Sequence, residues 1–264
     1  MKTRIISGLI MLPLIIVLYF RGIPLAVVAF IISALAIREV FKAFEKIDVY
    51  PNLFFSWGAL VVLYAIHFLF PGNLAFVTFW LAGTVVAAFI AFFAVTKHKA
   101  VDLSATVFGT VYIGFLVYHI VMIDETGYGV MVWLVAITAI CTDIFAYFIG
   151  MFFGHRKLAP TLSPKKTVEG ALGGILGSVF GSMVFFVIVH VGSVPHILLM
   201  GILGSVMAQL GDLSASLIKR QIGIKDYGHI LPGHGGIMDR FDSIIFTAPT
   251  IYYYLVLVMP EMGS

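Results

Sequence analysis

The feature that most constrains the fold of this chain is a series of nine apolar segments, each about long enough to cross a lipid bilayer. A helix rises about 1.5 Å per residue, so roughly 20 apolar residues span a hydrocarbon core about 30 Å thick. The segments cover residues 5–20, 23–43, 53–70, 74–95, 104–123, 129–152, 168–191, 194–220 and 243–259. We therefore expect an all-α polytopic integral membrane protein with about nine transmembrane helices.

The composition excludes other classes of protein. Hydrophobic residues make up 61% of the 264 residues and charged residues only 11%, a ratio that no soluble domain of this size can bury. The single cysteine, Cys141, excludes an intrachain disulfide and is expected to be a packing residue. The net charge of +3 gives no indication of nucleic-acid binding.

The N-terminal segment resembles a signal peptide, because Lys2 and Arg4 precede the apolar run of residues 5–20. No small-residue cleavage site follows, and Arg21 leads directly into the next apolar segment. We interpret this segment as an uncleaved first membrane helix.

The basic residues predict how the chain is oriented in the membrane. With a cytoplasmic N-terminus and nine helices, all 16 of them except Arg21 lie on the cytoplasmic side, as the positive-inside rule requires. The C-terminus is then outside, and the expected location is the cytoplasmic (inner) membrane. We divide the chain into N-terminal helices (1–100), middle helices with a cytoplasmic basic loop (101–167) and a C-terminal catalytic region (168–264).

Small residues recur at helical spacing in the C-terminal region. Gly173, Gly177 and Gly181 share one helix face, and Gly204 and Ala208 share a face of the next helix. Such faces let membrane helices approach closely. Packing within the subunit is the favoured interpretation, and a homodimer interface is the alternative.

Residues 211–243 concentrate charge in an otherwise apolar chain. Ionisable groups near a bilayer are costly, so a cluster of them indicates function. The eight charged residues are Asp212, Lys219, Arg220, Lys225, Asp226, Asp239, Arg240 and Asp242. They surround a glycine-rich loop, residues 221–236, whose close turns and N–H groups suit phosphate binding. This arrangement indicates a metal-assisted site for phosphate chemistry.

Helical spacing divides the cluster into faces. One stripe carries, at helical intervals, Gln209, Asp212, Ser216, Lys219 and Arg220. Snorkelling at a helix end is the alternative for the two cations, but it does not explain Asp212. Asp239 and Asp242 share a face at the start of the last helix.

Three aspartates without a set of Cys or His ligands favour Mg²⁺ over zinc. We expect Asp212, Asp239 and Asp242 to be its ligands, with a second cation left open. A buried ion-pair network with Lys219, Arg220 and Arg240 is the alternative.

Two further elements are candidates for the same site. Asp143 lies inside an apolar segment, where an acid is a functional candidate and a hydrogen bond to Thr or Tyr is the structural alternative. Lys165 and Lys166 precede a helix, whose N-terminus attracts anions. Lys165 and Lys166 could also serve only to keep this loop in the cytoplasm, and their spacing does not favour either the anion-binding or the topological interpretation.

The C-terminal half carries a specific sequence pattern. It consists of the runs Ser216-Leu217-Ile218-Lys219-Arg220, Lys225-Asp226-Tyr227-Gly228 and Leu231-Pro232-Gly233-His234-Gly235-Gly236-Ile237-Met238-Asp239-Arg240-Phe241-Asp242. Together they resemble the signature of the phosphatidate cytidylyltransferases, or CDP-diacylglycerol synthases, without departure. Residues 163–170 are similar to an upstream segment of that family. For the N-terminal half the resemblance rests on hydropathy alone.

The resemblance implies a magnesium-dependent nucleotidyltransferase of phospholipid biosynthesis. It would transfer a cytidylyl group from CTP to phosphatidate, giving CDP-diacylglycerol and pyrophosphate. The expected catalytic residues are Asp212, Lys219, Arg220, Asp239 and Arg240. The expected substrate-binding residues are Lys165, Lys166, Ser216, Lys225, His234, Gly235 and Gly236, with His234 shaping the loop or binding phosphate.

Two alternatives remain at this stage. Another membrane phosphotransferase would also use aspartates and Mg²⁺, although the Asp-Gly-x-x-Ala-Arg pattern of CDP-alcohol enzymes is absent. An ion-coupled transporter would use intramembrane acids, but it should place its charges around a midplane site. Here the charges lie toward the expected cytoplasmic ends of the helices.

Overall fold

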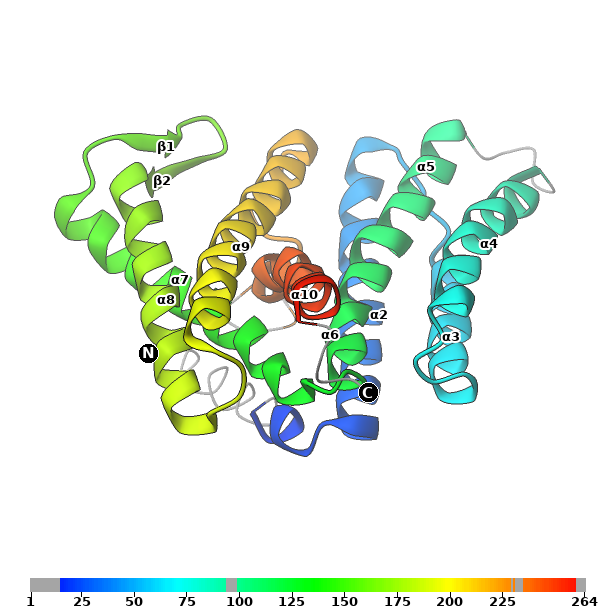
Figure 1. Cartoon of the computed structure of the whole chain (residues 1–264). Coiled ribbons are helices and arrows are strands. Elements are labelled where there is room, and N and C mark those ends of the chain that lie inside the picture. The colour runs from blue at the N-terminus through cyan, green and yellow to red at the C-terminus, as the bar shows by residue number, and fades with distance from the viewer. Residues whose placement is uncertain (1–14, 94–98, 229, 231–234, 260–264) are drawn as a thin grey trace. The chain divides into compact units, whose positions relative to one another are not determined.

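The computed structural model describes residues 15–93, 99–228, 230 and 235–259. Helices dominate these residues, joined by short turns and one small hairpin (Figure 1). The helices before the hairpin are α2 (Gly22–Phe44), η1 (Glu45–Ile47), α3 (Leu53–Leu69), α4 (Leu74–Phe93), α5 (Ala100–Gly109), η2 (Thr110–Phe115), α6 (Leu116–Asp124), η3 (Gly129–Met131) and α7 (Val132–Phe153). The hairpin of β1 (Lys157–Ala159) and β2 (Ser163–Thr167) leads into α8 (Val168–Val189), α9 (Val194–Ile222) and α10 (Met238–Val258).

Seven of the described helical segments are long and apolar enough to cross a membrane, and the apolar helix α3 is shorter. The predicted class, an all-α polytopic membrane protein, is therefore confirmed. The first expected segment, 5–20, lies mostly outside the described residues, of which 15–20 are helical. The count of nine and the orientation of the two ends stay predictions.

The chain divides into two compact units, and each unit consists of two separate stretches of the sequence. The first comprises Met1–Glu125 and Ile222–Arg240, and the second comprises Thr126–Gln221 and Phe241–Ser264. The last helix, α10, begins at Met238, five residues before the expected 243. It therefore starts in the first unit and continues in the second.

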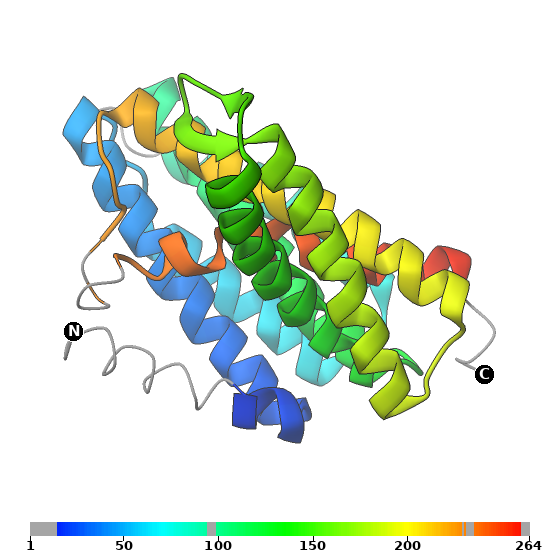
Figure 2. The ribbon, with the colours of Figure 1, turned by 90° about the vertical axis from the view of Figure 1, so that its left-hand side faces the viewer.

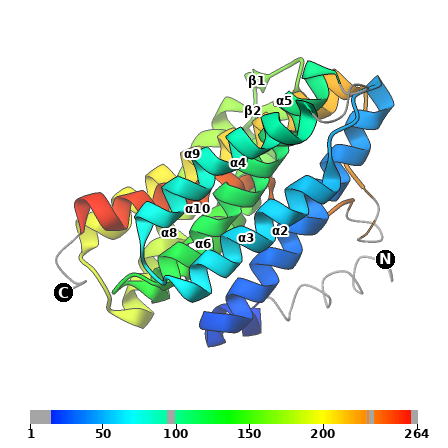
Figure 3. The same ribbon diagram turned by 90° about the vertical axis from the view of Figure 1, so that its right-hand side faces the viewer.

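In the first unit, α2 packs against α3 and α6, and α3 packs against α4 (Figure 3). The segments α5, η2 and α6 follow one another without a break and form one apolar span of 25 residues, with a π-helical turn in its middle. The span begins at a buried carboxylate, because Asp102 accepts hydrogen bonds from the N–H groups of Lys99 (2.9 Å) and Tyr50 (2.7 Å). The bond from Lys99 caps the start of α5, and the bond from Tyr50 joins this helix start to the segment before α3.

In the second unit, α7 and α8 lie side by side along their length (Figure 2). The predicted glycine stripe makes this contact: a Cβ atom on Gly173 would meet Ile149, one on Gly177 would meet Phe145, and one on Gly181 would meet Cys141. Glycine is needed there because the α7 side chains occupy the space of a Cβ. Packing of the stripe within the subunit is thus confirmed, and a homodimer stays an untested prediction.

The segment between α7 and α8, which the sequence predicts to be a loop, forms the β1–β2 hairpin in the structure. Its antiparallel strands pair Lys157 with Thr167 and Ala159 with Ser163. Thr167 then caps α8, since its Oγ1 accepts a bond from the N–H of Gly170 at 3.1 Å. The hairpin base is held as well, because Oε2 of Glu169 accepts bonds from His155 N–H (3.1 Å) and Arg156 N–H (3.2 Å).

Candidate active site

A cavity of about 340 Å³ lies in the second unit, lined by α7, the hairpin, the start of α8 and α9. Its polar lining residues are Thr142, Asp143, Lys165, Lys166, Thr167, Gln209 and Asp212. Its larger apolar lining residues are Tyr147, Met151 and Leu158. Four residues predicted from separate parts of the sequence, Asp143, Lys165, Lys166 and Asp212, thus line one cavity.

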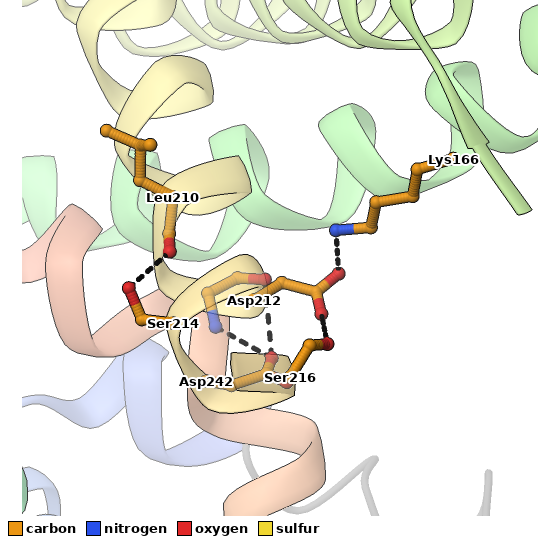
Figure 4. Close-up of polar contacts among 7 residues, drawn as sticks. Lys166, Leu210, Asp212, Ser214, Ser216 and Asp242 are labelled. Atoms are coloured by element: carbon orange, nitrogen blue, oxygen red, sulfur yellow. Dashed lines mark hydrogen bonds and ion pairs between the residues drawn. The ribbon is translucent and has the colours of Figure 1, made fainter. Parts of the chain in front are cut away.

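Asp212 occupies the centre of the polar contacts (Figure 4). Its Oδ2 forms an ion pair with Nζ of Lys166, which reaches it from β2. Its Oδ1 accepts a hydrogen bond from Ser216 Oγ at 3.4 Å, one helical turn later on α9. The predicted Asp–Ser stripe of this helix is therefore present, and its cation partner comes from the hairpin.

The second aspartate, Asp242, lies on α10 next to this part of α9. The contact depends on Gly211, because a Cβ atom there would clash with the backbone oxygen of Asp242. The Asp242 side chain is buried, and its Oδ1 accepts a bond from the Ser243 N–H at 2.8 Å. It interacts electrostatically with Asp212, with Lys219 and with Asp143. Three aspartates and one lysine thus share one polar region.

Arg220 has a contact that the sequence did not predict. Its Nε donates a hydrogen bond to the backbone oxygen of Leu162, at the turn of the hairpin, with a distance of 3.2 Å. The end of α9 therefore holds the hairpin that carries Lys165 and Lys166. Arg220 can position these lysines besides any role toward phosphate.

Asp239 organises the glycine-rich loop of the first unit. Its Oδ2 accepts hydrogen bonds from Tyr227 N–H (2.8 Å) and from Gly236 N–H (3.0 Å). Gly235 between them has a φ of +82°, a conformation that favours glycine.

The other predicted residues lie as follows. Ser216 is buried on α9, whereas Lys225 and Arg240 are exposed. Gly236 is buried against Glu39, and His234 lies outside the described residues.

Two contributions were missed by the sequence reasoning. The spacing of Gln209 predicts only that it shares a helix face with Asp212. In the structure its Nε2 donates a hydrogen bond to Ala171 O at 3.2 Å and joins α9 to α8 at the cavity. Glu39 on α2 was not considered as a site residue, although it is buried and accepts a bond from the Met238 N–H. An acid inside an apolar segment was the available signal.

The carboxylates fit a magnesium ion in number and kind. No group of three or more His, Cys, Asp or Glu residues is arranged as a complete metal site in the part of the chain that the structure describes. Magnesium usually takes one or two carboxylates and completes its shell with water and substrate phosphates. Asp212 and Asp242 supply such a pair, and the Lys166 ammonium already places a positive charge against Asp212.

Comparisons with known proteins show the family to which the chain belongs. Residues 2–258 match the model of the cytidylyltransferase family. The chain is 31% identical to the phosphatidate cytidylyltransferase of Staphylococcus haemolyticus over 266 residues, which covers 96% of this chain and 97% of that protein. It is 42% identical to the Bacillus subtilis phosphatidate cytidylyltransferase over 151 residues, or 56% of each chain. The chain is 33% identical to the Brucella suis phosphatidate cytidylyltransferase over 214 residues, which covers 80% of this chain and 76% of that protein.

Proposed function

The chain belongs to the cytidylyltransferase family and is a nucleotidyltransferase, and we propose that it transfers the cytidylyl group of CTP to phosphatidate. The products are CDP-diacylglycerol, a precursor in phospholipid biosynthesis, and pyrophosphate. The observation that carries this proposal is the cavity in which Lys165 and Lys166 meet Asp212, beside Asp242 and Lys219. Lysines bind phosphate, and paired carboxylates bind the cation that accompanies a triphosphate.

The reaction needs positioning more than a strong base. A phosphate oxygen of phosphatidate attacks the α-phosphorus of CTP, forming a new P–O bond. The bond from the α-phosphorus to the bridging oxygen breaks, and the pyrophosphate leaves with that oxygen. Because the nucleophile is already an anion, catalysis depends on alignment and charge stabilisation. Lys165, Lys166 and Lys219 would hold the phosphates of the two anionic substrates in one place.

We assign Asp212 and Asp242 as the carboxylates that would hold Mg²⁺, and a ligand role of Asp239 stays a prediction from the sequence. When bound, the ion would neutralise charge on the transferred and leaving phosphates. Ser216 supports Asp212 through its hydrogen bond and fixes the orientation of that carboxylate. Asp143, which interacts with Asp242, adds to the negative potential that attracts the cation.

The proposed location is the bacterial inner membrane, with the site open to the cytoplasm. The relatives are bacterial proteins, and seven helices are long and apolar enough to span a membrane. All the site lysines except Lys225 lie on β2 or in the last turn of α9, where the positive-inside rule predicts the cytoplasm. This orientation gives water-soluble CTP access from one side, while phosphatidate comes from the bilayer.

A direct assay tests the proposal. The purified full-length chain is incubated in detergent with phosphatidate and CTP labelled on its α-phosphate, with Mg²⁺ or with a chelator. Label should enter the lipid phase, together with stoichiometric pyrophosphate, only when CTP, phosphatidate and Mg²⁺ are all present. Incorporation from a UDP-sugar, or consumption of CDP-diacylglycerol with an alcohol, would instead identify another phosphotransferase. No pyrophosphate under any condition would refute CTP and phosphatidate as the substrates.

A further inference from the structure

Glu39 is a charged residue in an unexpected place. It lies on α2, inside the apolar span Gly22–Ile47, and its relative exposure is 5%. A carboxylate in such a span is costly and is retained when it has a specific use. The contacts of Glu39 indicate what that use is.

The first contact is with the beginning of α10. Oε2 of Glu39 accepts a hydrogen bond from the N–H of Met238, the first residue of that helix, at 2.9 Å. The first N–H groups of a helix have no partner within the helix, and the partial positive charge there favours an anion. Glu39 therefore holds the backbone at the start of α10, directly after the glycine-rich loop.

The second contact is with the loop itself. A Cβ atom on Gly228 would lie 2.8 Å from Cδ of Glu39, and one on Gly236 would lie 2.7 Å from the same atom. Neither glycine has a positive φ, in contrast to Gly235. The two glycines are therefore required for space, because both described ends of the loop press on one carboxylate.

We infer that Glu39 is a positioning residue for the start of α10 and for Gly228 and Gly236, a role that rests on the proposed function, in which α10 carries Asp239 and Asp242. Asp239 holds the N–H groups of Tyr227 and Gly236, and Glu39 holds that of Met238. Together the two carboxylates hold the backbone at Tyr227, Gly236 and Met238.

A double-mutant cycle tests the contact. Gly236→Ala alone should lower kcat/KM for CTP about tenfold, because its methyl group displaces the Glu39 carboxylate. In a Glu39→Ala chain the obstructing atoms are gone, so the same glycine change should lower the remaining activity less than about twofold. Residues in direct contact show such coupling, whereas distant residues add independently. Gly58→Ala is the matched control, since no atom lies within 4 Å of its Cβ position, and it should be additive with Glu39→Ala.

The conservative variant separates positioning from general stability. Glu39→Gln keeps an acceptor for Met238 N–H and should retain most of the activity, whereas Glu39→Ala should raise the KM for CTP more than it lowers kcat. The exposed Glu45 provides a second control as Glu45→Ala. If Glu39→Ala cannot be purified in folded form, Glu39→Asp replaces it, because its shorter side chain withdraws the carboxylate from both glycines.

Hydrogen exchange gives a readout that does not depend on activity. In Glu39→Ala, the amides of Met238 and residues 235–240 should exchange at least about tenfold faster, while those of α7 and α8 stay unchanged. Unchanged exchange at Met238, or an equal effect of Gly236→Ala in both backgrounds, would overturn the inference. If instead the exchange changes but the wild-type chain shows no CTP-dependent transfer, Glu39 holds the loop and the proposed function is wrong.

Discussion

Lys166 on β2 and Asp212 on α9 form an ion pair between a surface hairpin and a membrane helix. Both side chains are about a quarter exposed, 28% and 27% respectively, so the pair lies at the edge of the cavity and not in a closed core. An ammonium group at this carboxylate occupies a position that suits a metal ion. If the proposed function holds, we expect Lys166 to exchange its partner Asp212 for a substrate phosphate.

Removing the charge of either paired carboxylate should abolish most of the activity. Asp212→Asn and Asp242→Asn should each lower kcat/KM by about 100-fold or more and raise the Mg²⁺ concentration needed for half-maximal activity. Ser214→Ala is a control on the same helix, because its Oγ donates only to Leu210 O of α9, at 2.8 Å, in the contacts that the structure gives (Figure 4). Full activity of Asp212→Asn at low Mg²⁺ would refute the metal assignment.

Replacing Lys166 should have opposite effects on metal and on lipid binding. Lys166→Met removes the cation that competes at Asp212, so Mg²⁺ should bind about two- to fivefold more tightly, as expected for a partly exposed ion pair. The KM for phosphatidate should rise, because a phosphate ligand is lost. Calorimetric titration of Mg²⁺ without substrates gives the first value, and steady-state kinetics gives the second. Lys157→Met, on the exposed face of the same hairpin, should change neither.

The glycine stripe should matter for stability more than for chemistry. A Cβ atom on Gly177 would lie 2.5 Å from Cδ2 of Phe145, so Gly177→Ala should destabilise the chain by about 1–3 kcal/mol through overpacking. Thermal unfolding in detergent measures this change. Gly83→Ala on α4 meets no atom within 4 Å and should instead leave stability unchanged or raise it by up to about 1 kcal/mol. Equal effects of the two changes would contradict the packing of α7 on α8.

The orientation in the membrane can be tested independently of activity. A reporter that is active only outside the cytoplasm, fused after Ser264, should be active, because nine helices place the C-terminus outside. The same reporter fused after Lys99, in an expected cytoplasmic loop, should be inactive. Activity only in the second fusion would reverse the orientation and move the proposed site to the wrong side for CTP.

Part of the site was predictable because side chains three or four residues apart lie on the same face of a helix. The spacing of Asp212 and Ser216 places them on one face of α9, and the structure shows their hydrogen bond. Lys165 and Lys166 were predicted beside a helix start and do line the cavity with Asp212. The predicted grouping of Asp239 with the other two aspartates was not tested, since the contacts of Asp239 lie in its own unit.

The remaining parts depend on contacts between residues far apart in sequence. Nothing local indicates that Arg220 bonds to the hairpin turn at Leu162. The role of Glu39 was equally hidden, because a single acid in an apolar segment has no periodic pattern and its partner Met238 lies almost 200 positions away.

The sequence by itself determined the class of protein, the approximate limits of most membrane helices and the concentration of charge in residues 211–243. It could do so because hydrophobic length and helical periodicity are local properties that a bilayer imposes on each segment. Only the tertiary structure decided which charges meet. Asp242 comes beside Asp212 because Gly211 leaves room for α10, and Glu39 reaches Met238 because Gly228 and Gly236 leave room for its carboxylate. These pairings depend on close packing between helices, which no single segment encodes.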